Sequence, residues 1–176
     1  MGLVYVANIG TNTVSVIESK THSVIANVPV GDQPNAVAIT PDGQLVYIAN
    51  RGDGFNPSTV SVIDGKSHIV IATVSVGVNP IALAITPDGQ LVYVTNSGDS
   101  PGTVSVIDTR THSTIATVTV GLGPIALAIT SDGQLVYVAN SVFAGNNTVS
   151  VIDTKTQSVI ATLPVDRPVA LAITPN

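Results

Sequence analysis

The sequence contains no cysteine and no tryptophan, and only 3% of its 176 residues are aromatic. A chain without cysteine has no disulfide, no thiolate nucleophile and no zinc–sulfur site. Charged residues make up 10% of the chain, against roughly 25% in an ordinary soluble domain. Thr, Ser, Asn and Gly must therefore cover most of the surface, as is common in secreted and cell-surface proteins.

Positive charge is especially scarce, and the net charge is −5. The six basic residues are scattered along the chain: Lys20, Arg51, Lys66, Arg110, Lys155 and Arg167. A nucleic-acid-binding protein needs a clustered basic face, and none can be assembled here. No apolar run approaches the ~18 residues of a membrane span, and the N-terminus lacks the charged region and cleavage site of a signal peptide. We therefore expect no nucleic-acid partner and no membrane insertion.

What the chain has in abundance is Val, Ile, Leu and Ala, which bring its hydrophobic content to 44%. Val and Ile favour extended, half-buried strands. One apolar hexapeptide occurs four times and contains all four tyrosines, Tyr5, Tyr47, Tyr93 and Tyr137. Its copies are LVYVAN (3–8), LVYIAN (45–50), LVYVTN (91–96) and LVYVAN (135–140). Internal repetition at this period decides the fold class.

Nearly all the variation among the repeats falls in one segment. Successive tyrosines are 42, 46 and 44 residues apart, and the differences lie between the Asn that ends the hexapeptide and the next Thr. These segments have four, eight, six and seven residues and read IGTN, RGDGFNPS, SGDSPG and SVFAGNN. The only other change is one residue lost before Pro168.

Each repeat has the pattern of four short strands. An apolar run such as IALAIT (125–130) ends in a Pro/Ser-Asp-Gly hairpin turn, which leads into the tyrosine strand. A third strand such as TVSVID (148–153) alternates apolar and hydroxyl side chains, and a polar turn precedes the fourth. Four strands per repeat, with no helical periodicity, are typical of a β-propeller blade. We predict an all-β chain that forms one propeller or half-propeller over residues 1–176, with repeats at about 3–44, 45–90, 91–134 and 135–176.

At Tyr93 to Asn96 the chain resembles the YVTN-repeat β-propellers, which occur in archaeal surface-layer proteins and bacterial secreted proteins. The resemblance extends to the Asp-Gly turn before the motif and to TVSVID and IATV after it, through all four repeats. It implies a propeller, usually of seven blades, and an extracellular, cell-surface or periplasmic location. It implies no single activity. The chain departs from that family in having four repeats.

The repeats are offset in a way that predicts a closed ring. The first repeat starts at a second strand, and a spare first strand stands at residues 169–174. Left open, residues 3–8 would be an apolar edge prone to aggregation. Four blades in one ring would meet at about 90°, against about 45° for eight, and the strands carry no adaptation to the steep angle. We expect a homodimer in which two chains form an eight-bladed ring by strand complementation. A four-bladed ring within one chain and a fragment of a longer propeller are the alternatives.

Several polar residues recur at fixed positions, and each has a structural explanation beside a functional one. One repeat position carries His22, His68 and His112, with Gln157 in the fourth copy, which suggests a metal site. Turns of different blades lie too far apart for their side chains to bind one metal ion at the ~2 Å of a metal–ligand bond, so solvated turn residues are favoured. Two carboxylate sets suggest a calcium ring or an acid–base pair, but turn capping explains both. The sets are Asp42, Asp88 and Asp132, and Glu18, Asp64, Asp108 and Asp153.

The amides and hydroxyls of the tyrosine strand have the same two interpretations. Asn8, Asn50, Asn96 and Asn140 could face a ligand, but we expect them to bond the backbone where the strand ends. The tyrosines are expected to pack between blades, with their hydroxyls paired at the edge.

The variable loops are the best candidates for a binding site. In a propeller, loops between second and third strands open on the same face as the fourth-to-first connections. The variable loops should therefore share one rim, the loop rim, with the Gly-x-x-Pro segments at residues 31–34, 77–80 and 121–124. Loops on a rigid scaffold often carry function, and Phe and Arg are enriched at interface hot spots. The candidate binding residues are Arg51, Asp53, Phe55, Asp99, Phe143, Asn146 and Arg167. Arg51-Gly52-Asp53 spells the integrin tripeptide, which ordinary loop chemistry explains, and Asn146 opens a glycosylation acceptor that matters only in a eukaryotic host.

No Ser-His-Asp arrangement, phosphate loop or paired-carboxylate cleft can be assembled from the sequence. We therefore expect a non-catalytic propeller without cofactor or metal, which binds an unknown protein or polysaccharide through the loop rim or serves as a structural module. One alternative is an enzyme of the lactonase or quinoprotein type, since related propellers host such sites. Another is a glycan-binding module, which the repeated Asp and Asn favour and the absence of Trp disfavours.

Overall fold

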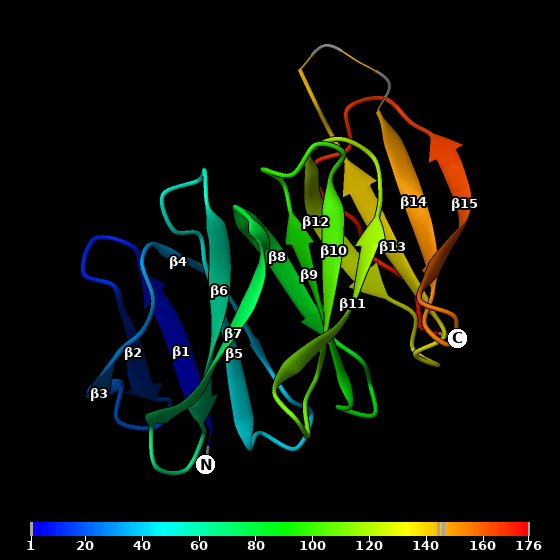
Figure 1. The fold of residues 1–176 in the computed structure, drawn as a ribbon. Helices are drawn as coiled ribbons and strands as arrows, with labels where there is room; N and C mark the ends of the chain where they lie inside the picture. Colours follow the sequence, from blue (N-terminus) through cyan, green and yellow to red (C-terminus); the bar gives the residue numbers. More distant parts are fainter. Residues whose placement is uncertain (1, 144, 146, 176) are drawn as a thin grey trace.

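A computed structural model of the chain describes residues 2–143, 145 and 147–175. All of its strands lie in four antiparallel sheets, and the described residues contain no helix and hence no helical segment that could cross a membrane. The sheets stand side by side in chain order, from the blue end of the chain to the red end (Figure 1). The predicted all-β propeller architecture is confirmed.

We name the sheets blades one to four. Blade one contains β1 (Leu3–Asn8), β2 (Thr13–Glu18) and β3 (Ser23–Pro29). Blade two contains β4 (Pro34–Ile39), β5 (Leu45–Asn50), β6 (Pro57–Asp64) and β7 (Ile69–Val78). Blade three contains β8 (Pro80–Ile85), β9 (Leu91–Asn96), β10 (Thr103–Asp108) and β11 (Ser113–Thr119). Blade four contains β12 (Pro124–Ile129), β13 (Leu135–Asn140), β14 (Thr148–Asp153) and β15 (Ser158–Pro164).

Within each complete blade the strands follow one another in chain order, as a meander. The first strands β4, β8 and β12 form one edge of their sheets and adjoin one another, so they are the innermost strands of the arc. The Asp-Gly turn behind each inner strand has the predicted form. Gly43, Gly89 and Gly133 have φ of 72°, 73° and 72°, which a glycine adopts without strain.

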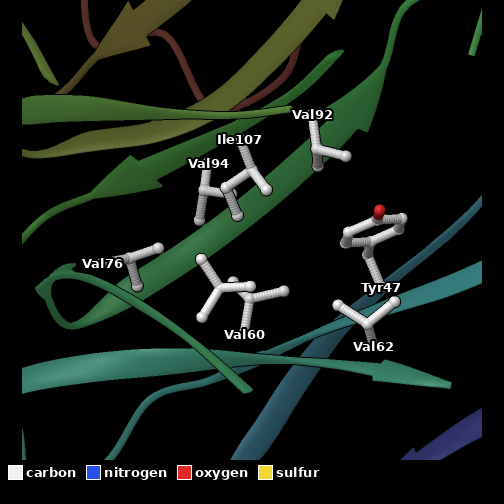
Figure 2. Close-up of a cluster of buried hydrophobic side chains, with 8 residues drawn as sticks. Tyr47, Val60, Val62, Val76, Val92, Val94 and Ile107 are labelled. Carbon is white, nitrogen blue, oxygen red and sulfur yellow. The ribbon is translucent and has the colours of Figure 1, made fainter. Parts of the chain in front are cut away.

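The core consists of three layers, each between two neighbouring blades. Figure 2 shows the layer between blades two and three, where Tyr47, Val60 and Val62 point at Val92 and Val94. All five side chains are fully buried. A strand turns successive side chains to opposite faces, and the middle strands of an inner blade have a neighbour on both sides. This explains why the tyrosine strands β5 and β9 read as nearly continuous apolar runs.

The structure does not show the four-bladed ring that was one alternative for a single chain. Blade one has only three strands, and residues 169–174, expected as a strand, form none. Blade one lies at one end of the arc and the C-terminal segment at the other (Figure 1). The four-bladed ring within one chain is therefore not formed. A strand exists only when hydrogen-bonded to a neighbour, and the free edge of β1 is out of reach of its own chain's last segment.

Candidate functional site

The variable loops and the fourth-to-first connections are hydrogen-bonded to one another, which confirms that they share one rim. The Arg51 amide donates to the Gln33 carbonyl at 3.0 Å, and the Ser97 amide donates to the Asn79 carbonyl at 3.0 Å. The Ser141 amide donates to Gly123 at 2.9 Å in the same way. Each loop is thus held by the chain segment that leads into its own blade.

These bonds depend on an unusual backbone conformation that the sequence reasoning missed. The residue before the proline that ends each of these connections, and before Pro168, has a left-handed φ: 53° at Gln33, 55° at Asn79, 60° at Gly123 and 43° at Arg167. Such a conformation costs roughly 1–3 kcal/mol for a residue other than glycine. The signal was present in Asn79 and Gly123, because Asn and Gly are the types that tolerate this region. Arg167 is the least suited of the four.

The Arg-Gly-Asp segment serves the loop's own architecture. The Arg51 Nε donates to Asn79 Oδ1 at 2.7 Å, which joins the loop to the neighbouring connection. The Asp53 carboxylate accepts the amides of Phe55 and Asn56, each at 2.9 Å, and the Asn56 side chain at 2.7 Å. These bonds, led by the Asn56 amide, lower the pKa of Asp53. Both charged groups are occupied within the molecule.

Asp99 has a similar role in the loop of blade three. Its carboxylate accepts the Val78 amide at 3.0 Å and the Thr103 hydroxyl. It therefore ties the variable loop to the end of β7 and the start of β10. Like Asp53, it shapes the rim rather than extending from it.

The two phenylalanines of the rim project into solvent. Phe55 and Phe143 have exposed fractions of 87% and 88%. The structure brings Phe143 together with Arg167, whose guanidinium carbon lies 5.1 Å from the ring centroid, within cation–π range. Phe55 lies in the loop of another blade. The remaining candidate, Asn146, lies outside the described residues.

The recurring histidines lie in turns, as expected, but two of the three are only partly exposed and face a tyrosine. The Tyr5 hydroxyl lies 3.4 Å from His68 Nδ1, and the Tyr47 hydroxyl lies 3.3 Å from His112 Nδ1. The Tyr93 hydroxyl donates to Gln157 Oε1 at 3.0 Å. Each pair joins a tyrosine to the following blade. The sequence signal was the near-constant separation of the partners, by 63, 65 and 64 residues.

The geometry of these tyrosines matches the expectation that they pack between blades. Burial raises the pKa of Tyr47 to about 12, with a smaller contribution from the charge of Asp108. His68, His112 and Gln157 all have left-handed φ, between 51° and 57°. The turn conformation therefore aims each side chain back at the preceding blade.

The asparagines that end the tyrosine strands bond side chains, not the backbone as expected. Nδ2 of Asn96 donates to the hydroxyls of Thr103 and Ser105, both at 2.9 Å. Its Oδ1 is buried and accepts no hydrogen bond from the described residues, as is also true of Asn50 and Asn140. Each side chain packs under the glycine of a Gly-x-x-Pro connection. A Cβ at Gly31, for example, would come within 2.6 Å of Asn50 Nδ2.

The repeated aspartates cap their own turns, as predicted. Asp88 accepts the Thr86 hydroxyl at 2.6 Å and the Gln90 amide at 3.0 Å, and these bonds lower its pKa. Asp108 accepts the Thr111 amide at 2.7 Å and the Arg110 amide at 3.0 Å, with the same effect on its pKa. Among the described residues, no three His, Cys, Asp or Glu side chains are placed to hold a metal ion.

Comparison with known proteins places this geometry in a family. The model of the cytochrome D1 heme domain, an eight-bladed β-propeller fold, matches residues 2–121. Hydrazine synthase of Kuenenia stuttgartiensis superposes with a TM-score of 0.86 and 28% identity, over 93% of this chain and 46% of that one. A functionally unknown protein of Desulfotomaculum acetoxidans superposes with a TM-score of 0.76 and 20% identity, over 94% of this chain and 53% of that one.

A curated relative covers a smaller part of the chain. Antigen Lp49 of Leptospira interrogans serogroup Icterohaemorrhagiae serovar copenhageni is 35% identical over 49 residues, which is 28% of this chain and 11% of the antigen. The chain thus spans about half the length of the two solved structures, at 46% and 53%, and 11% of this antigen. The YVTN resemblance drawn from the motifs is not tested by these matches and stays a prediction.

The family name raises the question of a heme. Heme iron takes its axial ligand from His, Met, Cys or Tyr. The inner strands β4, β8 and β12 read PNAVAI, PIALAI and PIALAI, and none of these residues can ligate iron. His68 and His112 lie in the turns before the outermost strands and face tyrosines. The chain belongs to the family of the cytochrome D1 heme domain, whose propeller fold it shares; its described inner strands supply no axial ligand for that family's heme.

Proposed function

We propose that this chain is a non-catalytic propeller module that binds a protein partner through the loop rim. The observation that carries the proposal is the position of its phenylalanines. The chain has only two, both lie in variable loops, and both are almost fully exposed. A protein that fully buries Tyr47 and Tyr93 between blades has a reason to leave these two in water. A binding site is that reason, because exposed aromatic residues anchor interfaces.

The rest of the rim makes such a site rigid. Arg51 and Asp99 hold their loops to neighbouring segments, and Asp53 braces its own loop, so the free rim keeps its shape before a partner arrives. Preorganisation lowers the entropy lost on binding. Arg167 lies over one face of Phe143 and adds a positive charge to that anchor. The site we propose is therefore Phe55, Phe143 and Arg167 on a scaffold made by the other loop residues.

The experiment compares the wild-type chain with a Phe55→Ser, Phe143→Ser double variant. A random-peptide phage library panned against the wild type should yield peptides that lose at least tenfold in affinity for the double variant. The control is Ile160→Ser on the outer strand β15, since Ile160 is 58% exposed and far from the loops in its blade. The control should bind the same peptides as the wild type. Peptides that bind all three proteins equally would overturn the proposal.

A glycan is the alternative ligand of the same rim. Exposed phenylalanines can stack on sugars as well as on protein side chains, although Trp, absent here, has the larger face. A glycan array probed with the wild type and the double variant separates the two ligand classes. Glycan hits that require Phe55 and Phe143, together with a failed peptide selection, would assign the rim to polysaccharide.

A redox enzyme is the second candidate function, and the family match favours it. It requires that the protein retain a heme or a quinone, by contacts other than an axial ligand from the inner strands. Absorption spectra and intact mass of the purified protein decide the matter. A stoichiometric chromophore would replace the binding proposal with this one.

We also propose an extracellular, cell-surface or periplasmic location, which the motif resemblance and the low content of charge support.

A further inference from the structure

Blade one lacks the inner strand that every other blade has. Blades two, three and four each begin with a strand of the type PIALAI, whereas β1 has an unpaired edge. Residues 168–174 read PVALAIT and match PIALAIT of residues 124–130 at six of seven positions. The structure thus contains one blade without an inner strand and one inner-strand sequence without a blade.

The face of blade one that looks away from blade two is apolar and uncovered. Val4 and Val6 of β1 are 48% and 40% exposed. Their counterparts in β5, Val46 and Ile48, are fully buried against blade one. The same hexapeptide is therefore covered in the inner blades and bare at this end.

The opposite end of the arc has the complementary face. Leu163 and Val165 are 46% and 39% exposed, whereas their counterparts Val74 and Val76 are 4% and 7% exposed. Tyr137, Val149 and Leu163 line a hollow of about 570 Å³ together with residues 171–174. In the inner layers, such faces receive the inner strand of the next blade, as Leu83 and Ile85 pack against the Tyr47 layer. Residues 171–174 already lie where that strand belongs.

We propose that these two faces bind each other between two copies of the chain, which together form an eight-bladed ring. Residues 169–174 of each copy add to the free edge of β1 of the other and complete its blade one. The inner blades specify the register of this pairing. Ile39, Ile85 and Ile129 lie opposite Val46, Val92 and Val136, so Ile173 should lie opposite Val4 of the second copy. By the same rule Ala172 lies opposite Tyr5, as Ala128 does opposite Tyr137.

The polar pairs between blades are completed by the same contact. Tyr5, Tyr47 and Tyr93 each face a His or Gln of the following blade. Within the described residues, no blade follows that of Tyr137 and no tyrosine of a preceding blade faces His22. In the ring, the Tyr137 hydroxyl of each copy faces His22 of the other copy, so the contact forms once at each of the two junctions. Open ends that match in strand register, apolar surface and hydrogen bonding favour a second copy over an unrelated partner.

This inference does not depend on ligand binding at the rim, although it doubles the number of loops around the axis. The first test is the mass of the chain in solution by light scattering. We expect twice the 17.9 kDa of one chain. Val6→Asp should reduce the mass to that of one chain, because it places a charge in the proposed interface. Ile160→Asp, at an outward position that is exposed in every blade, should remain a dimer.

The second test identifies the strands that pair. The chain has no cysteine, so a Val4→Cys, Ile173→Cys variant contains no thiols other than those placed at the proposed junctions. Directly opposed residues of antiparallel strands lie about 4.5–5.5 Å apart at Cα, within disulfide reach. Oxidation should give a covalent dimer on a non-reducing gel. As a control, a chain with only one of the two cysteines, mixed with the wild type, should give no band at the position of that dimer. A disulfide within a monomer would show a four-bladed ring instead. A monomer with two free thiols would leave the faces open and overturn the proposal.

Discussion

The layers between neighbouring blades and the two open ends of the arc are built from the same residues. Val94 in the layer between blades two and three is fully buried, and its counterpart Val6 at the open end is 40% exposed. Val118 is 5% exposed in the inner layer, and its counterpart Leu163 is 46% exposed. The difference shows that these side chains are buried only where a neighbouring blade covers them. A repeat cannot bury both of its faces alone.

The comparison also separates the scaffold from the rim. The layers use Val, Ile and Tyr at equivalent positions, with the same tyrosine contact at each step. The rim uses a different set of bonds in each loop, with Asp53 in one and Asp99 in the next. Specificity is therefore expected in the loops, and assembly in the layers.

The largest effect should come from removing apolar volume in an inner layer. Val94→Ala should lower the free energy of unfolding by about 2 kcal/mol, because it leaves a cavity between two blades. At a dilution at which the chain is a monomer, Val6→Ala should cost less than about 0.5 kcal/mol, because that side chain is already in water. Urea unfolding curves measure both. Equal losses in the dilute monomer would show that the open face is covered in some other way.

A smaller effect is expected at the tyrosine contacts. Tyr47→Phe removes the hydroxyl that faces His112 and should cost about 1 kcal/mol. Tyr137→Phe should cost almost nothing in the monomer, since its hydroxyl has no hydrogen bond in the described part of the chain. Because the folded-state pKa of Tyr47 is raised to about 12, its contribution is complete below pH 10 and is lost as pH rises from 10 towards 12. Thermal melts between about pH 8 and 11 bracket the ordinary tyrosine pKa of about 10. Over this range the melting temperature of Tyr47→Phe should fall less than that of the wild type.

The smallest effect should distinguish the turn caps. The Asp108 carboxylate accepts two amides and a hydroxyl, whereas among the described residues the Glu18 carboxylate, at the matching place in blade one, accepts only the Thr21 hydroxyl. Asp108→Asn should therefore lower the melting temperature at neutral pH more than Glu18→Gln does. The folded-state pKa of Asp108 is lowered, so its contribution is present above about pH 4, the ordinary range of an Asp carboxyl, and is lost as pH falls further. The melting temperatures of Asp108→Asn and wild type should converge in acid, and a gap that persists at pH about 2 would contradict this account.

Much of the fold could be predicted from the sequence because it repeats. The hairpin turn at Asp88-Gly89, the alternation in β10 and the shared rim are local consequences of residue types at fixed spacing. The contacts made by the candidate site residues could be predicted less well. Arg51, Asp53 and Asp99 are loop-holding residues, and the contact between Arg167 and Phe143 joins segments that no local pattern relates. The role of His68 depends on a tyrosine one blade away, so the turn containing it does not reveal its partner.

By itself, the sequence determined the blade: four strands in chain order, the turns between them and the positions at which loops vary. These follow from the period of two in a strand, from the φ preferences of Pro, Asp and Gly, and from the spacing of the repeats. Only the tertiary structure decided how the blades stack, which tyrosine meets which histidine, and that one chain forms an open arc with residues 169–174 unpaired. The physical reason is that a strand's hydrogen bonds and burial depend on a neighbour, and the neighbour's identity is a property of three-dimensional arrangement.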